Sequence, residues 1–314
     1  MRILLHRRDD IYAPWLRDFA AMMPEADVVV WREKGEDDVE DIAPCDYAVL
    51  WSPPPAMLPA LAHVKAIFLT GAGADGLLKY GDAVPQVPIV RLGDAGMALH
   101  MIEYITHATL RYFRRFDQYE AQARNGQWRQ LDAIARAEFS VGVLGAGVLG
   151  TRVLQALAPY GFPLRAWNRG VKQIAGVQCY AGTDSLADFL RGTRVLVCML
   201  PLTPETTNLL DRAHLALLPA GAYLINVGRG GHVAEPDLLA LVKSGHIAGA
   251  TLDVFRNEPL PGPHPFWEEP RITITPHIAA LTLVTESVEQ IVAKMRALER
   301  DEPIDDVVDR SKGY

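Results

Sequence analysis

The glycine-rich stretch VLGAGVLG at residues 143–150 restricts the possible folds of this chain more than any other feature. It contains the pattern Gly-x-Gly-x-x-Gly, preceded by the apolar run FSVGVLG and followed by residues with helical patterning. In a strand–turn–helix unit the first glycine permits a tight turn, the second lets the backbone approach a pyrophosphate, and the third lets helix and strand pack closely. The alternative is a purely structural turn. Because strand and helix patterns are both in place, we predict a dinucleotide-binding loop formed by Gly145, Ala146, Gly147, Val148, Leu149 and Gly150.

The turn WNRGVK at residues 167–172 bears on which dinucleotide binds. It ends the next strand, roughly 20 residues beyond the glycines, where an Asp or Glu commonly binds the ribose hydroxyls. Asn168 stands there instead and removes the repulsion that a carboxylate would exert on a 2′-phosphate. Arg169 can pair with a phosphate and stack on adenine, and Lys172 adds a positive charge. A solvated surface turn is the alternative, but the charge pattern favours NADP(H) over NAD(H).

Short apolar runs alternate with helical segments along the chain, which predicts an α/β fold with two doubly wound parallel-sheet domains and a cleft between them. The first series has expected strands at 2–6, 27–31, 47–51, 66–70 and 88–92, and helices at 12–23 and 75–80. The second has expected strands at 139–145, 163–168, 194–200, 222–227, 249–255 and 272–276. A helical stretch from Met97 to about Arg124 is expected to connect the domains, and a helix at 285–300 to return to the first one.

Composition excludes several classes of protein. The formal net charge of −7 and a pI near 5.7, without a basic stripe, argue against nucleic-acid binding. No segment approaches the ~20 apolar residues of a membrane span, and the N-terminus reads as a strand and not as a signal peptide. The widely spaced Cys45, Cys179 and Cys198 predict reduced thiols and a cytoplasmic location. The histidines form no cluster with metal-ligand spacing, so no metal is expected.

Three reactive side chains follow strands of the second series, where an open α/β sheet binds its ligands. Arg229 lies in INVGRGG, Glu258 in LDVFRNEPL and His277 in TPHIAAL. Singly they could be a surface arginine, a solvated glutamate and a histidine with a structural partner. Because all three follow strands of one nucleotide-binding series, we predict that they form a catalytic set.

The chain resembles the D-isomer-specific 2-hydroxyacid dehydrogenase family over essentially its full length. The resemblance rests on GAGVLG, LPLTPET at 200–206, INVGRGG, LDVFRNEPL and TPHIAAL. Within the family it is most similar to the glyoxylate/hydroxypyruvate reductase A group, through LWSPP at 50–54, TGAGADGL at 70–77, YFRRFDQY at 112–119 and the C-terminal GY. The resemblance implies a Rossmann NAD(P)-binding domain at 98–281, inserted in a flavodoxin-like substrate domain made of 1–97 plus 282–314.

The chemistry of the three residues agrees with what this family implies. Arg229 would bind the carboxylate of a 2-oxo acid and polarise its carbonyl. His277 would exchange a proton with the carbonyl oxygen, and Glu258 would hydrogen-bond the other imidazole nitrogen and favour its charged form. The substrate carboxylate is also expected to meet backbone N–H groups around Ala72, Gly73 and Ala74, in what could otherwise be a plain glycine turn.

Further contacts are implied by the resemblance alone. Trp51 is expected to line the substrate pocket, with a core position as the alternative, and Trp128 to reach across the interface of a homodimer. Asp253 is expected to accept a hydrogen bond from the carboxamide of the cofactor, with a buried structural role as the alternative. The remaining expected cofactor contacts, beyond the glycine loop and the turn after it, are Leu200, Pro201, Thr206, Val227, Gly228, Arg229, His277 and Ala279.

These expectations together predict an NADPH-dependent reductase of small 2-oxo acids, glyoxylate and hydroxypyruvate first. Within enzymes, the same scaffold could act on another 2-oxo or 2-hydroxy acid, or on phosphite or formate. From a different class, the chain could be a nucleotide-sensing interaction protein without turnover, and retention of all three reactive residues argues against that.

Overall fold

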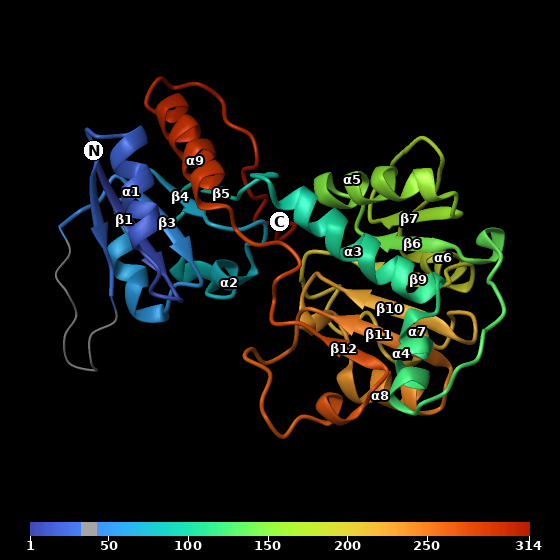
Figure 1. Ribbon diagram of the computed structural model, residues 1–314. Helices are drawn as coiled ribbons and strands as arrows, with labels where there is room; N and C mark the ends of the chain where they lie inside the picture. The colour runs from blue at the N-terminus through green and yellow to red at the C-terminus, as the bar shows by residue number, and fades with distance from the viewer. Residues whose placement is uncertain (33–42) are drawn as a thin grey trace. The chain divides into compact units, whose positions relative to one another are not determined.

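The computed structural model describes residues 1–32 and 43–314, which form two compact units (Figure 1). Unit 1 consists of Met1–Met97 and Thr282–Tyr314, and unit 2 consists of Ala98–Leu281. Both are α/β structures with all-parallel sheets, so the predicted fold class is confirmed. Among the described residues, every helix is too short or too polar to span a lipid bilayer.

Unit 1 is built on a five-stranded sheet in the order β2-β1-β3-β4-β5, which is the flavodoxin-like order. Its strands are β1 (Arg2–Arg7), β2 (Asp27–Val30), β3 (Tyr47–Trp51), β4 (Ala66–Leu69) and β5 (Ile89–Val90). Its helices are α1 (Ala13–Met22), α2 (Asp75–Leu78) and α9 (Val284–Leu298). The C-terminal α9 packs beside α1, so both ends of the chain build this unit (Figure 1).

Unit 2 is built on a seven-stranded sheet in the order β12-β11-β10-β9-β6-β7-β8. Counted from β6, this contains the 3-2-1-4-5-6 order of the Rossmann fold. Its strands are β6 (Val141–Leu144), β7 (Leu164–Asn168), β8 (Val177–Ala181), β9 (Val195–Cys198), β10 (Ala222–Asn226), β11 (Ile247–Leu252) and β12 (Ile272–Ile274). Its helices are α3 (Met97–Phe113, whose first residue still belongs to unit 1), α4 (Phe116–Arg124), α5 (Val148–Leu157), α6 (Leu186–Arg191), α7 (Arg212–Leu215) and α8 (Glu235–Lys243).

Short 3₁₀ helices complete both units. They are η1 (Pro55–Leu61), η2 (Gly81–Ala83), η3 (Arg136–Glu138), η4 (Ala158–Tyr160), η5 (Thr183–Ser185), η6 (Gly230–His232) and η7 (Pro265–Glu268).

Two hydrophobic cores cover the two faces of the unit 2 sheet. In β9, Val195 and Val197 point into the core shared with α3 and α5, while Leu196 and Cys198 point into the core shared with α6, α7 and α8. Successive strand residues face opposite sides, so a strand buried on both faces must be apolar throughout. This is why the sheet could be predicted from continuous apolar runs.

The helical stretch after Met97 differs from the prediction of one long helix. The structure has α3 and α4 with a break between them, where Arg115 adopts a left-handed conformation with φ of +58°. Strand β8 was not predicted at all. It lies at the edge of the sheet, where its residues are half-buried or exposed and Gln178 interrupts the run VQCYA.

Candidate active site

The glycine loop between β6 and α5 has no room for side chains at two of its three glycines. Gly145 has a φ of +94°, and a Cβ built there would lie 2.8 Å from the Met199 carbonyl oxygen. A Cβ at Gly150 would lie 2.2 Å from the Gly145 carbonyl oxygen, so this glycine lets α5 approach the loop. At Gly147, no described atom lies within 4 Å of a built Cβ. The loop is therefore open at the glycine expected to face a pyrophosphate, directly before the N-terminus of α5.

Asn168, the last residue of β7, holds the glycine loop with its side chain. Its Oδ1 accepts a hydrogen bond of 2.8 Å from the Ala146 N–H, and Lys172 Nζ donates to the Ala146 carbonyl oxygen at 2.7 Å. Because Oδ1 faces the loop, the amide nitrogen Nδ2 faces away from it. This nitrogen is buried and has no hydrogen-bond partner among the described residues. Asn168 therefore holds the loop with a neutral amide, where a carboxylate would place a negative charge.

Arg169 lies exposed beside the segment that follows β9. The pKa of Glu205 is lowered from its ordinary value, first by a hydrogen bond from Thr203 and in smaller part by the charge of Arg169. Within this segment, Thr206 Oγ1 donates to the Pro201 carbonyl oxygen at 2.8 Å and accepts from the Thr203 N–H at 2.8 Å. The Arg169 guanidinium thus lies near enough to Glu205, beside the turn that contains Thr206, for the two charges to interact.

Arg229 follows β10 and is fixed by a histidine that the sequence analysis did not single out. The Arg229 N–H donates to His232 Nδ1 at 3.1 Å, and His232 Nε2 donates to the Pro201 carbonyl oxygen at 3.2 Å. His232 is fully buried, whereas the Arg229 side chain is half-buried. Both ring nitrogens are used by the chain itself, so His232 fixes the backbone that carries Arg229. The available signal was a histidine in the glycine-rich turn, three residues after the arginine.

His277 and Glu258 form a hydrogen-bonded pair at the carboxyl ends of β12 and β11. His277 Nδ1 donates to Glu258 Oε2 at 2.8 Å, and Glu258 Oε1 accepts from the Phe255 N–H at 2.9 Å. Burial raises the pKa of Glu258, but the hydrogen bonds from His277 and Phe255, with smaller effects of the His277 and Arg229 charges, bring it below its ordinary value. The half-exposed imidazole is thereby oriented by an ionised carboxylate.

Asp253 anchors the turn that carries His277. Its carboxylate accepts hydrogen bonds from Thr275 Oγ1 at 2.7 Å, from the Ile278 N–H at 2.8 Å and from the Ala279 N–H at 2.8 Å. The turn needs this support because His277 has a φ of +56°, in the left-handed region that only few residue types adopt readily. Asp253 is 1% exposed. This geometry favours the structural alternative, and the expected contact with a carboxamide stays a prediction.

In unit 1, the loop between β4 and α2 carries the expected carboxylate-binding backbone. Ala72 and Gly73 are half-buried and Ala74 is buried directly before α2. Trp51 ends the neighbouring strand β3 with 40% of its surface exposed, which argues against the core position that was its alternative. All of these positions lie at the carboxyl edge of the unit 1 sheet.

The structure thus brings the expected residues of each unit to the carboxyl edge of its own sheet. In unit 2 this edge carries Arg229, Glu258 and His277, and also the glycine loop with Asn168 and Lys172. The turn of Arg229 also contains Val227 and Gly228, and the turn of His277 also contains Ala279. Both Val227 and Ala279 are buried. An edge with a carboxylate-oriented imidazole, a half-buried guanidinium and an open glycine loop is equipped for proton transfer to an anion beside a dinucleotide.

Comparison with known proteins agrees with this chemistry. Residues 106–279 match the family model described as D-isomer specific 2-hydroxyacid dehydrogenase, NAD binding domain. A glyoxylate/hydroxypyruvate reductase A from Serratia proteamaculans is 46% identical over 305 residues, covering 96% of each chain. A D-isomer specific 2-hydroxyacid dehydrogenase from Xanthobacter autotrophicus, solved with NADPH and MES, is 38% identical with a TM-score of 0.94, covering 100% of this chain and 99% of that one. An NADPH-dependent glyoxylate/hydroxypyruvate reductase from Sinorhizobium meliloti, solved with NADP and sulfate, is 33% identical with a TM-score of 0.92 at the same coverage.

Proposed function

This chain belongs to the D-isomer specific 2-hydroxyacid dehydrogenase family, and we propose that it is an NADPH-dependent reductase of small 2-oxo acids, glyoxylate and hydroxypyruvate first. The observation that carries the proposal is the set of Arg229, Glu258 and His277 at one sheet edge, beside a turn suited to a 2′-phosphate. In this proposal unit 2 binds the dinucleotide, and unit 1 contributes the substrate-binding backbone around Ala72–Ala74.

The residues divide the reaction between them. When bound, NADPH supplies the hydride that reduces the oxo carbon of the substrate. Arg229 binds the substrate carboxylate with its planar guanidinium and stabilises the charge that develops on the carbonyl oxygen. His277 gives that oxygen its proton from Nε2, because Nδ1 is held by Glu258. His232 and Asp253 act indirectly. His232 fixes the backbone of Arg229, and Asp253 fixes the turn that carries His277.

The cofactor preference rests on the turn after β7. The glycine loop would hold the pyrophosphate, and the Arg169 guanidinium would bind the 2′-phosphate, which the neutral Asn168 does not repel. Lys172 supports this site through the Ala146 carbonyl oxygen. The relatives solved with NADPH or NADP support the same preference.

Replacing Arg169 with aspartate is expected to weaken NADPH binding by about 10- to 100-fold, the effect of losing charge-assisted hydrogen bonds to a phosphate. NADH lacks the 2′-phosphate, so its affinity should change little. Titration of the variant with both nucleotides, followed by fluorescence or calorimetry, measures the two effects. Arg191→Asp, on the exposed Arg191–Asp188 pair of the same unit, is the matched control. Equal losses of affinity for NADPH and NADH would show that Arg169 does not bind the 2′-phosphate.

Replacing Glu258 with glutamine is expected to lower turnover and to move the pH profile of kcat/KM toward acid. The lowered pKa keeps Glu258 ionised at neutral pH. The stabilisation that the ionised carboxylate gives the folded protein is therefore fully present above the ordinary pKa of a glutamate, and it is lost as the pH falls through the lowered pKa of the folded state. Glutamine removes this charge at every pH, so His277 Nδ1 loses its ionised hydrogen-bond acceptor. Steady-state rates across the pH range check the shift. A profile identical to that of the wild type would show that Glu258 does not act on His277.

A panel of substrates with purified protein tests the proposed reaction. NADPH oxidation should accelerate on addition of glyoxylate or hydroxypyruvate, with glycolate or glycerate as the product. Faster turnover of a bulkier 2-oxo acid, or of phosphite or formate with NADP, would change the assigned substrate but not the assignment to the family. Tight NADPH binding without turnover of any of these would favour the nucleotide-sensing alternative.

We also infer a cytoplasmic homodimer. Trp128 is fully exposed in the extended segment after α4, which suits a side chain that is covered by a second copy. The thiols of Cys45, Cys179 and Cys198 are free, as expected in a reducing compartment.

A further inference from the structure

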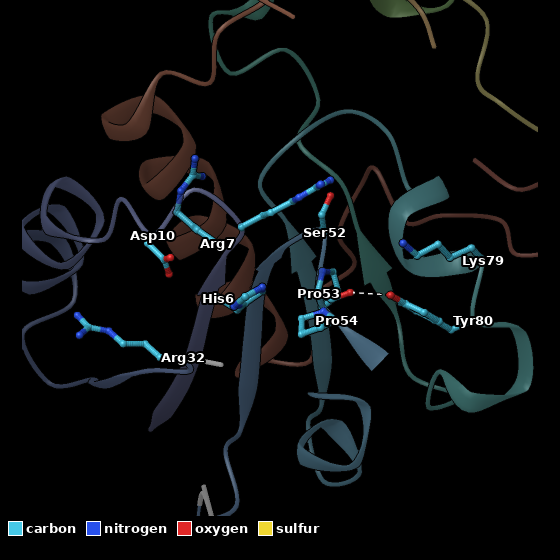
Figure 2. A pocket seen from close by; sticks show the side chains of 10 residues that line it. His6, Arg7, Asp10, Arg32, Ser52, Pro53, Pro54, Lys79 and Tyr80 are labelled. Carbon is cyan, nitrogen blue, oxygen red and sulfur yellow. Dashed lines mark hydrogen bonds between the residues drawn. The ribbon is translucent and has the colours of Figure 1, made fainter. Parts of the chain in front are cut away.

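Unit 1 contains a cavity of about 720 Å³ at the carboxyl edge of its own sheet (Figure 2). Its lining residues lie at the end of β1, in the segments after β1, β2 and β3, or directly after α2, so all of them belong to unit 1. The cavity lies at the point where the sheet changes direction, because β1 has β2 on one side and β3 on the other. Open α/β sheets bind ligands at such points, in pockets of roughly 300–1,000 Å³.

The described lining of the cavity carries more cationic than anionic side chains. Among the described residues it contains Arg7, Arg8, Arg32 and Lys79, against one carboxylate, Asp10. Arg7 is neutralised by Asp9, through hydrogen bonds of 2.9 and 2.6 Å. No carboxylate in the described part of the chain pairs with Arg8, Arg32 or Lys79. Among the described residues, this lining therefore offers more positive than negative charge, which favours anions.

Two contacts hold part of the cavity lining in place. Buried His6 packs edge-on against the Trp31 ring at 5.2 Å, and the Tyr80 hydroxyl donates to the Pro53 carbonyl oxygen at 2.9 Å. In Figure 2, Arg32 and Asp10 lie on one side of His6 and the prolines, and Lys79 and Tyr80 lie on the other. Cations on opposite walls of a formed cavity suit a ligand that carries negative charge at more than one position.

The cavity differs from the predicted carboxylate-binding loop but borders on it. Ala72, Gly73 and Ala74 are not among its lining residues. Arg7 joins the two places, since its Nη1 donates to Thr70 Oγ1 at 3.4 Å, directly before the loop, and its guanidinium lies 5.0 Å from the centre of the Trp51 ring.

We propose that this cavity binds a small, multiply charged oxyanion, either a polycarboxylate or a phosphate ester. The two arginines, Arg8 and Arg32, match carboxylate and phosphate oxygens with their planar forks, and Lys79 adds a point charge from the opposite wall. Binding at this cavity does not require dinucleotide binding or turnover. The proposed oxyanion site can therefore be tested independently of the proposed reaction.

Isothermal titration of the full-length protein with citrate and with inorganic pyrophosphate tests the site. Saturable binding of either probe is expected, and the tighter of the two identifies the source of the oxyanion as carboxylate or phosphate. The double variant Arg32→Glu/Lys79→Glu should weaken that binding by about 10- to 100-fold. Both side chains lie on the exposed rim, and thermal melting checks that the variant is folded.

Two controls separate this cavity from the other anion sites of the chain. Arg17→Glu/Arg300→Glu makes the same change in net charge on exposed residues of unit 1 away from the cavity, and binding should persist. Binding should also persist in Arg169→Asp and in Arg229→Gln, which alter the predicted dinucleotide and substrate sites. The proposal is wrong if neither probe binds saturably, if the rim variant binds as the wild type does, or if only Arg169→Asp or Arg229→Gln abolishes binding.

Discussion

Replacing His277 with asparagine is expected to lower kcat for 2-oxo acid reduction by about 10²- to 10⁴-fold, the usual effect of losing a general acid. Asparagine is chosen because His277 has a φ of +56°, and asparagine adopts this left-handed region more readily than other non-glycine residues. The turn, with its three hydrogen bonds to Asp253, should therefore keep its shape. The rate then falls because no group replaces the imidazole proton donor.

The measurement is a steady-state rate with saturating NADPH and 2-oxo acid, together with the affinity for NADPH. His214→Asn is the matched control, because His214 forms a similar pair with Asp211 at 2.8 Å on the exposed part of unit 2. The control should retain wild-type turnover. A His277→Asn variant that keeps more than a tenth of the wild-type kcat would contradict the assignment of the proton donor.

Replacing Arg229 with glutamine is expected to lower kcat/KM by about 30- to 5,000-fold, which corresponds to about 2–5 kcal/mol for removing one partner of a buried charge pair. The loss of kcat/KM should come from both a higher KM and a lower kcat. KM rises because the substrate carboxylate loses its cation, and kcat falls because the developing charge on the carbonyl oxygen is less well stabilised. Arg229→Lys should recover only part of the activity, since an ammonium keeps the charge without the planar fork.

Arg212→Gln provides the control for Arg229, because Arg212 is an exposed arginine at the start of α7 in the same unit. The affinity for NADPH should be unchanged in Arg212→Gln and should fall much less than kcat/KM in Arg229→Gln, because Arg229 is expected to contact the cofactor as well as the substrate. If Arg229→Gln altered NADPH affinity as strongly as kcat/KM, the main role of the residue would be in binding the cofactor.

Much of the fold was predictable because both sheets are covered on two faces. Strands such as β9 must then be apolar throughout, and continuous apolar runs between helical segments reveal them. The same rule explains what was missed. Strand β8 lies at an edge, and Gln178 interrupts its short apolar run. The break between α3 and α4 depends on the backbone of one residue, Arg115, for which the side-chain pattern gives no signal.

The candidate site was predictable where a motif carries its own chemistry. Arg229, Glu258 and His277 stand out because charged or titratable residues directly follow buried strands. The supporting contacts could not be predicted, because they join segments distant in sequence. Asn168 holds Ala146 across the glycine loop, and His232 holds the backbone of Arg229 against Pro201.

The basic cavity of unit 1 was hidden for the same reason. Its cations come from three separate places, Arg7 and Arg8 at the end of β1, Arg32 after β2, and Lys79 directly after α2. In the sequence each is an ordinary charged residue in a loop. Only the order of the strands brings them to one edge of the sheet.

The most direct test of the central claim is the initial rate of glyoxylate reduction by the wild-type protein, measured with NADPH and with NADH at equal, subsaturating concentrations. Asn168 and Arg169, placed beside an intact Arg229–Glu258–His277 set, predict rapid turnover with NADPH and a rate at least tenfold lower with NADH. Equal rates with the two nucleotides, or no turnover with either, would contradict the account.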